Sequence, residues 1–301
     1  MCDQPSHAAT LPWVRLVVLA ELALFGVLGL AYFIRSTRAA KTPPFLDVAA
    51  TAWCTGAGGT HNRRRQRALL AWRAAALLWA IGVLSRFYLP HGTPLGWNLS
   101  FYTVWNYHLQ LLDWACAVAA SACWLLHPDG APSSAAASAL KHLTLCLCEL
   151  CTPASVLVSI LLWGVLFPHA AAHGDYSDLS FNSFAMHAVN TVLLLVEFRV
   201  NRITVQRHHV LFILAWAMAY AIFAWVQHPF THCWPYFFLS LTSAEAIFWY
   251  AAIAGLHVVV YAAACWLSSL KERRFAPLLE GGLSESNGNL TAVCMNNEEG
   301  P

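Results

Sequence analysis

Charged residues are scarce in this chain. Only 11% of its 301 residues are Asp, Glu, Lys or Arg, against about 25% in a typical soluble domain. The formal net charge is only +2, so the chain lacks the basic face that nucleic-acid-binding proteins need, and we expect no nucleic-acid partner. Two enzyme motifs are also missing, because the sequence has no Gly-rich phosphate loop and no Gly-X-Ser-X-Gly nucleophile elbow.

Apolar residues dominate instead. Hydrophobic residues make up 58% of the chain, and its mean hydropathy is +0.53. Seven apolar stretches are long enough to cross a bilayer as helices. They span residues 14–34, 68–89, 99–126, 143–167, 181–200, 208–227 and 246–268. Because backbone polar groups in lipid must be bonded internally, the sequence predicts an all-α, polytopic integral membrane helix bundle with seven transmembrane helices.

This pattern divides the chain into three parts. Residues 1–67 hold an extra N-terminal span and a basic cytosolic loop, residues 68–270 form a core of six spans, and residues 271–301 form a polar tail that we predict to be disordered. Lys and Arg gather in alternate loops, which indicates an N-terminus outside or in a lumen and a C-terminus in the cytosol. The plasma membrane and the endoplasmic reticulum both fit this prediction.

Two of the spans carry polar residues along one helix face. The spacing is i, i+3, i+7, i+10 in the third span and i, i+3, i+10 in the fifth. The residues are Thr103, Asn106, Gln110 and Asp113 in the third span, and His187, Asn190 and Glu197 in the fifth. Polar groups are costly inside a bilayer and often mark a site. The alternative is that they form interhelical hydrogen bonds, each worth about 0.6 kcal/mol.

Thr103 and His187 lie near the outer ends of their spans, roughly 6 and 9 Å below the same surface at a rise of 1.5 Å per residue. A threonine hydroxyl becomes a nucleophile when a base removes its proton, and histidine is the commonest such base. The pair is therefore the candidate catalytic site, and the other five residues are candidate supporting groups. We expect no cofactor and no metal, because the thiols of Cys146-X-Cys148-X-X-Cys151 splay apart on a helix.

Two other ionisable residues fall inside predicted spans. Arg73 lies one turn into the second span, and we expect its long side chain to reach the cytosolic surface. Glu149 lies in the fourth span, where it is a further candidate to serve the site.

The same residues carry a family resemblance. The stretch Phe101–Asn106, followed by Gln110, resembles the Phe-Leu-Thr or Tyr-Leu-Thr stretch of the androgen-induced and androgen-dependent membrane hydrolases. The stretch Met186–Asn190, followed by Glu197, is similar to their His-X-X-(Asn/Thr) helix. His208 or His209, Tyr220, Trp225 and residues 236–239 then follow in the family's order. The resemblance covers roughly residues 70–270 and extends to the rolling stone proteins of the same fold family.

In its hydrolase branch, this resemblance implies a threonine nucleophile at Thr103, a histidine at His187, and fatty acid esters of hydroxy fatty acids as substrates. In its rolling stone branch, it implies a role in cell adhesion or the fusion of muscle precursors, with no catalysis guaranteed. The chain departs from the hydrolases in having Asn106 where they carry Asp, and in adding the span at 14–34.

Three hypotheses therefore stay open. The first is an intramembrane lipid ester hydrolase, and the second is a non-catalytic adhesion or myoblast fusion protein. The third is a seven-span receptor, although the chain lacks the Asp/Glu-Arg-Tyr and Asn-Pro-X-X-Tyr motifs of such receptors. The expected partners are a lipid substrate and the bilayer, and the sequence indicates no particular protein partner.

Overall fold

The computed structural model describes residues 11–39, 63–89, 98–126, 134–201 and 203–295. Within these residues, seven helical segments are long and apolar enough to cross a membrane. The described backbone is helical apart from turns and short loops, which confirms the all-α, multi-pass fold and the number of spans.

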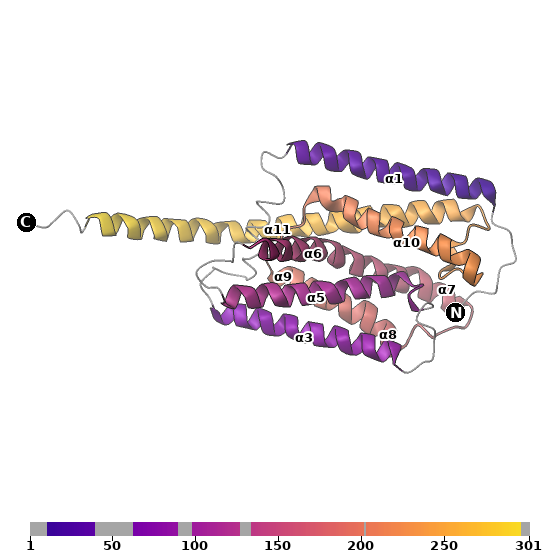
Figure 1. The fold of residues 1–301 in the computed structure, drawn as a ribbon, viewed down its shortest axis with the longest axis horizontal. Helices are drawn as coiled ribbons and strands as arrows, with labels where there is room; N and C mark the ends of the chain where they lie inside the picture. The colour runs from indigo at the N-terminus through magenta and orange to yellow at the C-terminus, as the bar shows by residue number, and fades with distance from the viewer. Residues whose placement is uncertain (1–10, 40–62, 90–97, 127–133, 202, 296–301) are drawn as a thin grey trace, which may run out of the picture.

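The segments run back and forth through one bundle (Figure 1). The first three are α1 (Pro12–Ala39), α3 (Arg63–Tyr88) and α5 (Tyr102–Leu126). The fourth joins α6 (Ala135–Leu161), η1 (Leu162–Leu166) and α7 (Phe167–Ala172), and the fifth joins α8 (Phe181–Ser183), η2 (Phe184–Val189) and α9 (Asn190–Val200). The last two are η3 (Arg207–His209) with α10 (Val210–Thr231), and α11 (Glu245–Met295), preceded by the short turn η4 (Phe237–Leu239).

The fourth segment is longer than its apolar stretch predicts. It starts at Ala135, eight residues before the predicted residue 143. Ser134 caps this start, since its hydroxyl accepts a hydrogen bond from the Ala137 amide at 3.2 Å. Alanine has the highest helix propensity, so the Ala-rich stretch continues the helix beyond the apolar residues.

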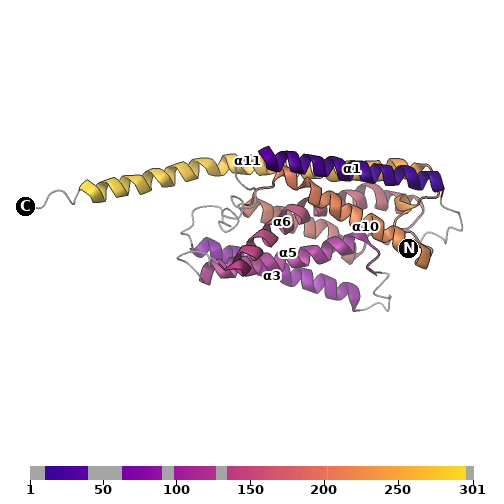
Figure 2. The same ribbon diagram turned by 45° about the horizontal axis from the view of Figure 1, so that its top comes forward.

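The helices α6 and α1 hold contrasting positions. The centre belongs to α6, which packs against α5, α9, α10 and α11. By contrast, α1 lies at the edge of the bundle, beside α10 and α11 (Figures 1 and 2). α1 therefore covers one flank of the bundle and contributes the buried side chains of Val14 and Val18 to its hydrophobic core.

The last helix extends well past the bundle. The backbone of α11 stays helical from Glu245 to Met295 and projects away from the other helices (Figure 1). The tail for which the sequence predicts disorder begins at residue 271 of this helix, and its disorder stays a prediction. Residues 296–301, and residues 40–62 of the predicted basic loop, lie outside the described part of the chain.

Candidate functional site

A polar cavity of about 860 Å³ lies at the end of the bundle where α5 and α8 begin. Thr103 and His187 both line it, so the structure brings the two candidate residues to one space. Other polar residues around it come from α7 and the loop after it, from α8, and from the segment before η4: they include His169, His173, Asp175, Asp178, Asn182 and Tyr236.

Thr103 is the second residue of α5 and is half-buried. Its neighbour across the cavity is Tyr236, which precedes η4. Burial raises the pKa of the Tyr236 phenol, and interactions with the Thr103 hydroxyl and backbone oppose that rise. The Thr103 side chain is therefore held beside a phenol that keeps its proton at neutral pH.

His187 lies in a π-helical turn. The turn is η2 (Phe184–Val189), which interrupts the helix between α8 and α9. The Ser159 hydroxyl of α6 donates to the His187 carbonyl at 3.0 Å and bonds the Thr191 hydroxyl at 2.7 Å, which holds the turn against α6. The His187 ring is buried, and its Nδ1 has no hydrogen-bond partner among the described residues. π-helical turns are rare and recur at functional sites, and a buried nitrogen without a partner needs an explanation.

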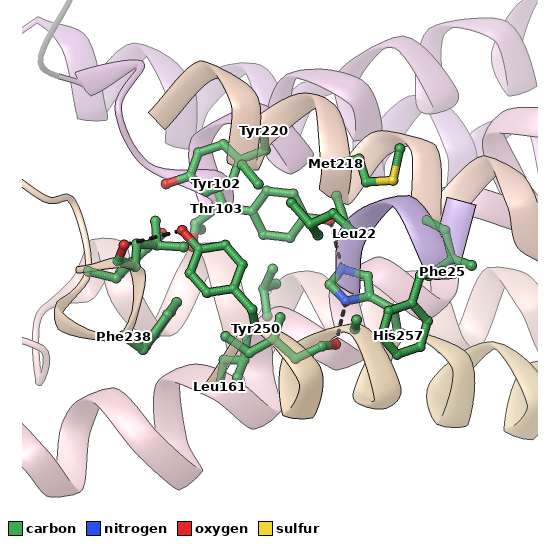
Figure 3. Close-up of a pocket in the computed structure, with 18 of the residues that line it drawn as sticks. Leu22, Phe25, Tyr102, Thr103, Leu161, Met218, Tyr220, Phe238, Tyr250 and His257 are labelled. Carbon is green, nitrogen blue, oxygen red and sulfur yellow. Dashed lines mark hydrogen bonds between the residues drawn. The ribbon is translucent and has the colours of Figure 1, made fainter. Parts of the chain in front are cut away.

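A second, apolar cavity of about 80 Å³ lies behind Thr103 (Figure 3). Residues from α1, α5, α6, α10 and α11 line it, and the hydroxyls around it are already bonded to protein. Tyr220 donates to the Ser100 carbonyl at 2.8 Å, and Tyr250 donates to the Leu239 carbonyl at 3.2 Å. The tyrosines therefore present their rings to this cavity. Thr103, Leu166 and Tyr236 line both cavities, so these side chains lie between the two.

Sequence reasoning missed His257, which lines the apolar cavity from α11. The ring contacts the Ile253 carbonyl through Nδ1 at 2.7 Å, so Nδ1 carries the hydrogen. In the neutral ring, Nε2 then accepts from the Tyr102 hydroxyl at 3.1 Å (Figure 3). Tyr102 precedes Thr103 in the chain, so this bond helps to orient the first turn of α5. The sequence feature that could have identified His257 is its position inside a span, since a polar side chain is costly in lipid and often marks a site.

The polar residues along one face of the third span and one face of the fifth form two polar stripes. The middle members of these stripes bond to neighbouring helices. Asn106 accepts a hydrogen bond from the Trp216 indole at 3.2 Å and donates to the Tyr102 carbonyl at 2.8 Å. The Asn190 amide donates to the Gln110 carbonyl oxygen, which joins the stripe on α9 to the stripe on α5. These residues line neither cavity. They connect helices below the cavities.

The deepest stripe residues belong to a buried ionic cluster. Arg73 donates from Nε to Glu197 Oε1 at 3.0 Å, and its Nη2 contacts the same oxygen. Asn201 also donates to that oxygen at 3.2 Å, and Asp113 lies close enough to interact with both charges. Arg73 is 0% exposed, so the prediction that it reaches the cytosolic surface is wrong. The physical reason is that a carboxylate on α9 lies at the same depth and pairs with it.

Glu149 also lies away from the cavities. Its carboxyl contacts the buried His209 Nδ1 and accepts a hydrogen bond from the Gln206 backbone amide at 2.9 Å. In the part of the chain that the structure describes, no group of three or more His, Cys, Asp or Glu side chains is placed to hold a metal ion.

Comparison with known proteins identifies the family of this chain. A family model described as FAR-17a/AIG1-like protein matches residues 73–269, which is well over half of the chain. The chain belongs to this family. Searches of curated proteins and of solved structures found no match.

The FAR-17a/AIG1-like match confirms the family resemblance that the motifs carry. It includes both cavity residues, Thr103 and His187, and the ionic cluster around Arg73. It begins after α1, which lies outside the matched residues. The chain is thus a membrane protein of the FAR-17a/AIG1-like family, and its first helix lies outside the matched residues.

Proposed function

We propose that this protein hydrolyses lipid esters within the membrane, with Thr103 as nucleophile and His187 as base. The observation that supports this most is the position of Thr103, which lines both an apolar cavity and a polar one that His187 also lines. An acyl ester needs this arrangement, because its chain is apolar while its carbonyl must meet a nucleophile, a base and water. The substrate class is a fatty acyl ester, such as a fatty acid ester of a hydroxy fatty acid.

In the proposed reaction, the Thr103 hydroxyl attacks the carbonyl carbon of the ester while neutral His187 takes the hydroxyl proton. The tetrahedral intermediate collapses, the bond to the alcohol oxygen breaks, and His187 returns the proton to the departing alcohol. Water from the polar cavity then hydrolyses the threonine ester by the same proton transfers, which releases the fatty acid and restores Thr103.

We infer that the polar cavity faces the outside or a lumen. Described basic residues are concentrated at the opposite end of the bundle: Arg35, Arg63, Arg64, Arg65, Arg67, Lys141, Arg199, Arg207 and Lys271. Only Arg15 and Arg86 lie at the cavity end among the described basic residues. Cys233, in the cavity-end loop between α10 and α11, is disulfide-bonded, as expected in an oxidising compartment. Both observations support a cytosolic C-terminus in the plasma membrane or the endoplasmic reticulum.

The test uses the full chain, purified and reconstituted in nanodiscs. Hydrolysis of fluorogenic acyl esters and labelling by a fluorophosphonate probe are measured for wild type, Thr103→Ala, His187→Gln and the double variant. The matched controls are Thr144→Ala and His142→Gln, which remove the same residue types at the opposite end of the bundle. Thermal unfolding of every variant checks that it is folded.

Each site variant is expected to lose activity by roughly 10³-fold, and the double variant to lose no more than the worse single one, since a nucleophile and its base act as a unit. The controls should keep wild-type rates. A folded wild type that neither hydrolyses the esters nor reacts with the probe would refute the proposal. The non-catalytic role in adhesion or fusion would then become the leading hypothesis.

A further inference from the structure

The helix outside the family match forms a wall of the apolar cavity. Leu22 and Phe25 of α1 line this cavity together with residues of α10 and α11 (Figure 3). The opposite face of α1 points away from the bundle, since Leu24 and Leu28 are each 57% exposed. In a bilayer, α1 therefore separates the cavity from the surrounding lipid.

Two glycines let α1 lie close to α10. A Cβ atom added at Gly29 would lie 3.2 Å from Leu211 Cδ1 and 3.5 Å from Leu214 Cδ1. One added at Gly26 would lie 3.6 Å from the Met218 side chain. Small residues at this interface hold the two backbones together and fix the depth to which Leu22 and Phe25 reach.

The lining indicates what the cavity holds. Its tyrosine hydroxyls are satisfied by protein groups, as is the His257 ring, so little hydrogen-bonding capacity remains for a polar ligand. The remaining surface is aromatic and aliphatic. The occupant that this surface fits is a hydrocarbon chain, and Thr103, which lines both cavities, defines where the chain's carboxyl end would lie.

We propose that α1 forms the lipid-facing wall of an acyl-chain site, and that Leu22 and Phe25 set the length of chain that the site accepts. This inference rests on the proposed function in one respect only, because it takes the carboxyl end of the chain to be the ester that reacts at Thr103. The family core supplies the reacting residues, and α1 supplies selectivity among substrates.

Binding is tested first, without turnover. The full chain in phosphatidylcholine nanodiscs is irradiated with palmitic acid that carries a terminal diazirine, and the labelled peptides are identified by mass spectrometry. We expect labels on α1, α10 and α11 residues that line the cavity, in wild type and in Thr103→Ala alike. Phe25→Trp and Leu22→Trp should reduce this labelling by about tenfold, because the larger ring fills space that the chain needs, and excluding about one methylene from an apolar pocket costs about that much affinity. Leu24→Trp, on the lipid-facing side of the same helix, should leave it unchanged.

Selectivity is tested second, with p-nitrophenyl esters of about 4 to 16 carbons, since each added methylene changes the fit to an apolar pocket. Phe25→Trp should shift the preference in kcat/KM toward short chains by about tenfold, and Phe25→Ala should shift it toward long chains. The enlarging variant removes atoms, so it remains informative where the tryptophan variant does not fold.

The outcomes separate the two proposals. Labels spread evenly over all lipid-facing helices, or equal effects of Phe25→Trp and Leu24→Trp, would overturn the acyl-chain site. Labels confined to the cavity in a folded protein without ester hydrolysis would support the acyl-chain site and refute the hydrolase. Hydrolysis with unchanged chain preference in both Phe25 variants would support the hydrolase and refute the role of α1.

Discussion

Breaking the buried pair between Arg73 and Glu197 should destabilise the bundle more than any change at its surface. Arg73 is 0% and Glu197 4% exposed, and the guanidinium also bonds the Ala117 carbonyl at 3.2 Å and the Ser121 hydroxyl. The pair connects α3 with α9, and Ser121 and Ala117 connect it with α5. Glu197→Gln keeps the shape of the side chain and removes only its charge.

The size of this loss of stability follows from the absence of water around the buried pair. Removing one partner of a buried ion pair costs about 3–5 kcal/mol, because the remaining charge has no water to replace its partner. At about 2–4 °C per kcal/mol for a core of this size, the midpoint of thermal unfolding should fall by roughly 6–20 °C. Replacing both residues by Met should restore part of this loss, because the double variant leaves neither member of the pair without its partner, and Asp113 stays as the one carboxyl of the cluster.

The assay is thermal unfolding in detergent, followed with a thiol-reactive dye. Cys148 and Cys151 are free and buried, so they react only when the bundle opens. Arg64→Gln, an exposed change on the same helix as Arg73, should alter stability by less than about 0.5 kcal/mol. The reasoning is refuted if Glu197→Gln shifts the midpoint no more than Arg64→Gln does, or if the double variant is as unstable as the sum of the single variants.

Three smaller effects follow from other contacts. Replacing either Gln110 or Asn190 by Leu should cost about 0.6–1.7 kcal/mol in the same assay, the range for interhelical hydrogen bonds in membranes, with little effect on probe labelling. Lys271→Met should cost about 1–3 kcal/mol, because its ammonium donates to acceptors at the end of α9. Burial, and then the Asp175 charge, raise the pKa of Asp178 above 3.8. The folded chain therefore holds this proton more tightly than the unfolded chain, and stability falls as pH rises from about 3.8 through the raised pKa. Asp178→Asn should flatten this decline in a pH series of unfolding midpoints; an unchanged series would contradict it.

The number of spans was predictable because bilayer thickness sets the length of apolar sequence that a span needs. The position of Thr103 and His187 at one cavity was predictable for a related reason. Both lie a few residues inside helices that start at the same surface, and the rise per residue converts sequence distance into depth. Span ends were less predictable, since the fourth helix begins at Ala135 in a stretch that is helical by propensity and not by hydropathy.

The partners of buried polar residues could not be predicted in the same way. A helix face can be read from spacing, but the helix that it meets depends on packing across the whole bundle. Arg73 was therefore expected to reach the surface, and instead it pairs with a residue 124 positions away. His257 belongs to no stripe, so spacing gave no reason to connect it with Tyr102, 155 positions away.

The seven predicted polar residues differ in one physical respect that bears on function. Asn106, Gln110, Asn190 and Glu197 each bond a side chain on another helix, so removing one of them leaves a partner unsatisfied in an apolar interior. Such changes act mainly on stability. Thr103 and His187 instead line a cavity: Thr103 interacts with Tyr236 there, and the His187 Nδ1 has no hydrogen-bond partner among the described residues. Loss of activity measured alone would not distinguish the two kinds of residue, because a bundle that unfolds is also inactive. The ratio of lost activity to lost stability does distinguish them, and a catalytic pair requires that ratio to be large at positions 103 and 187 and small at the other positions.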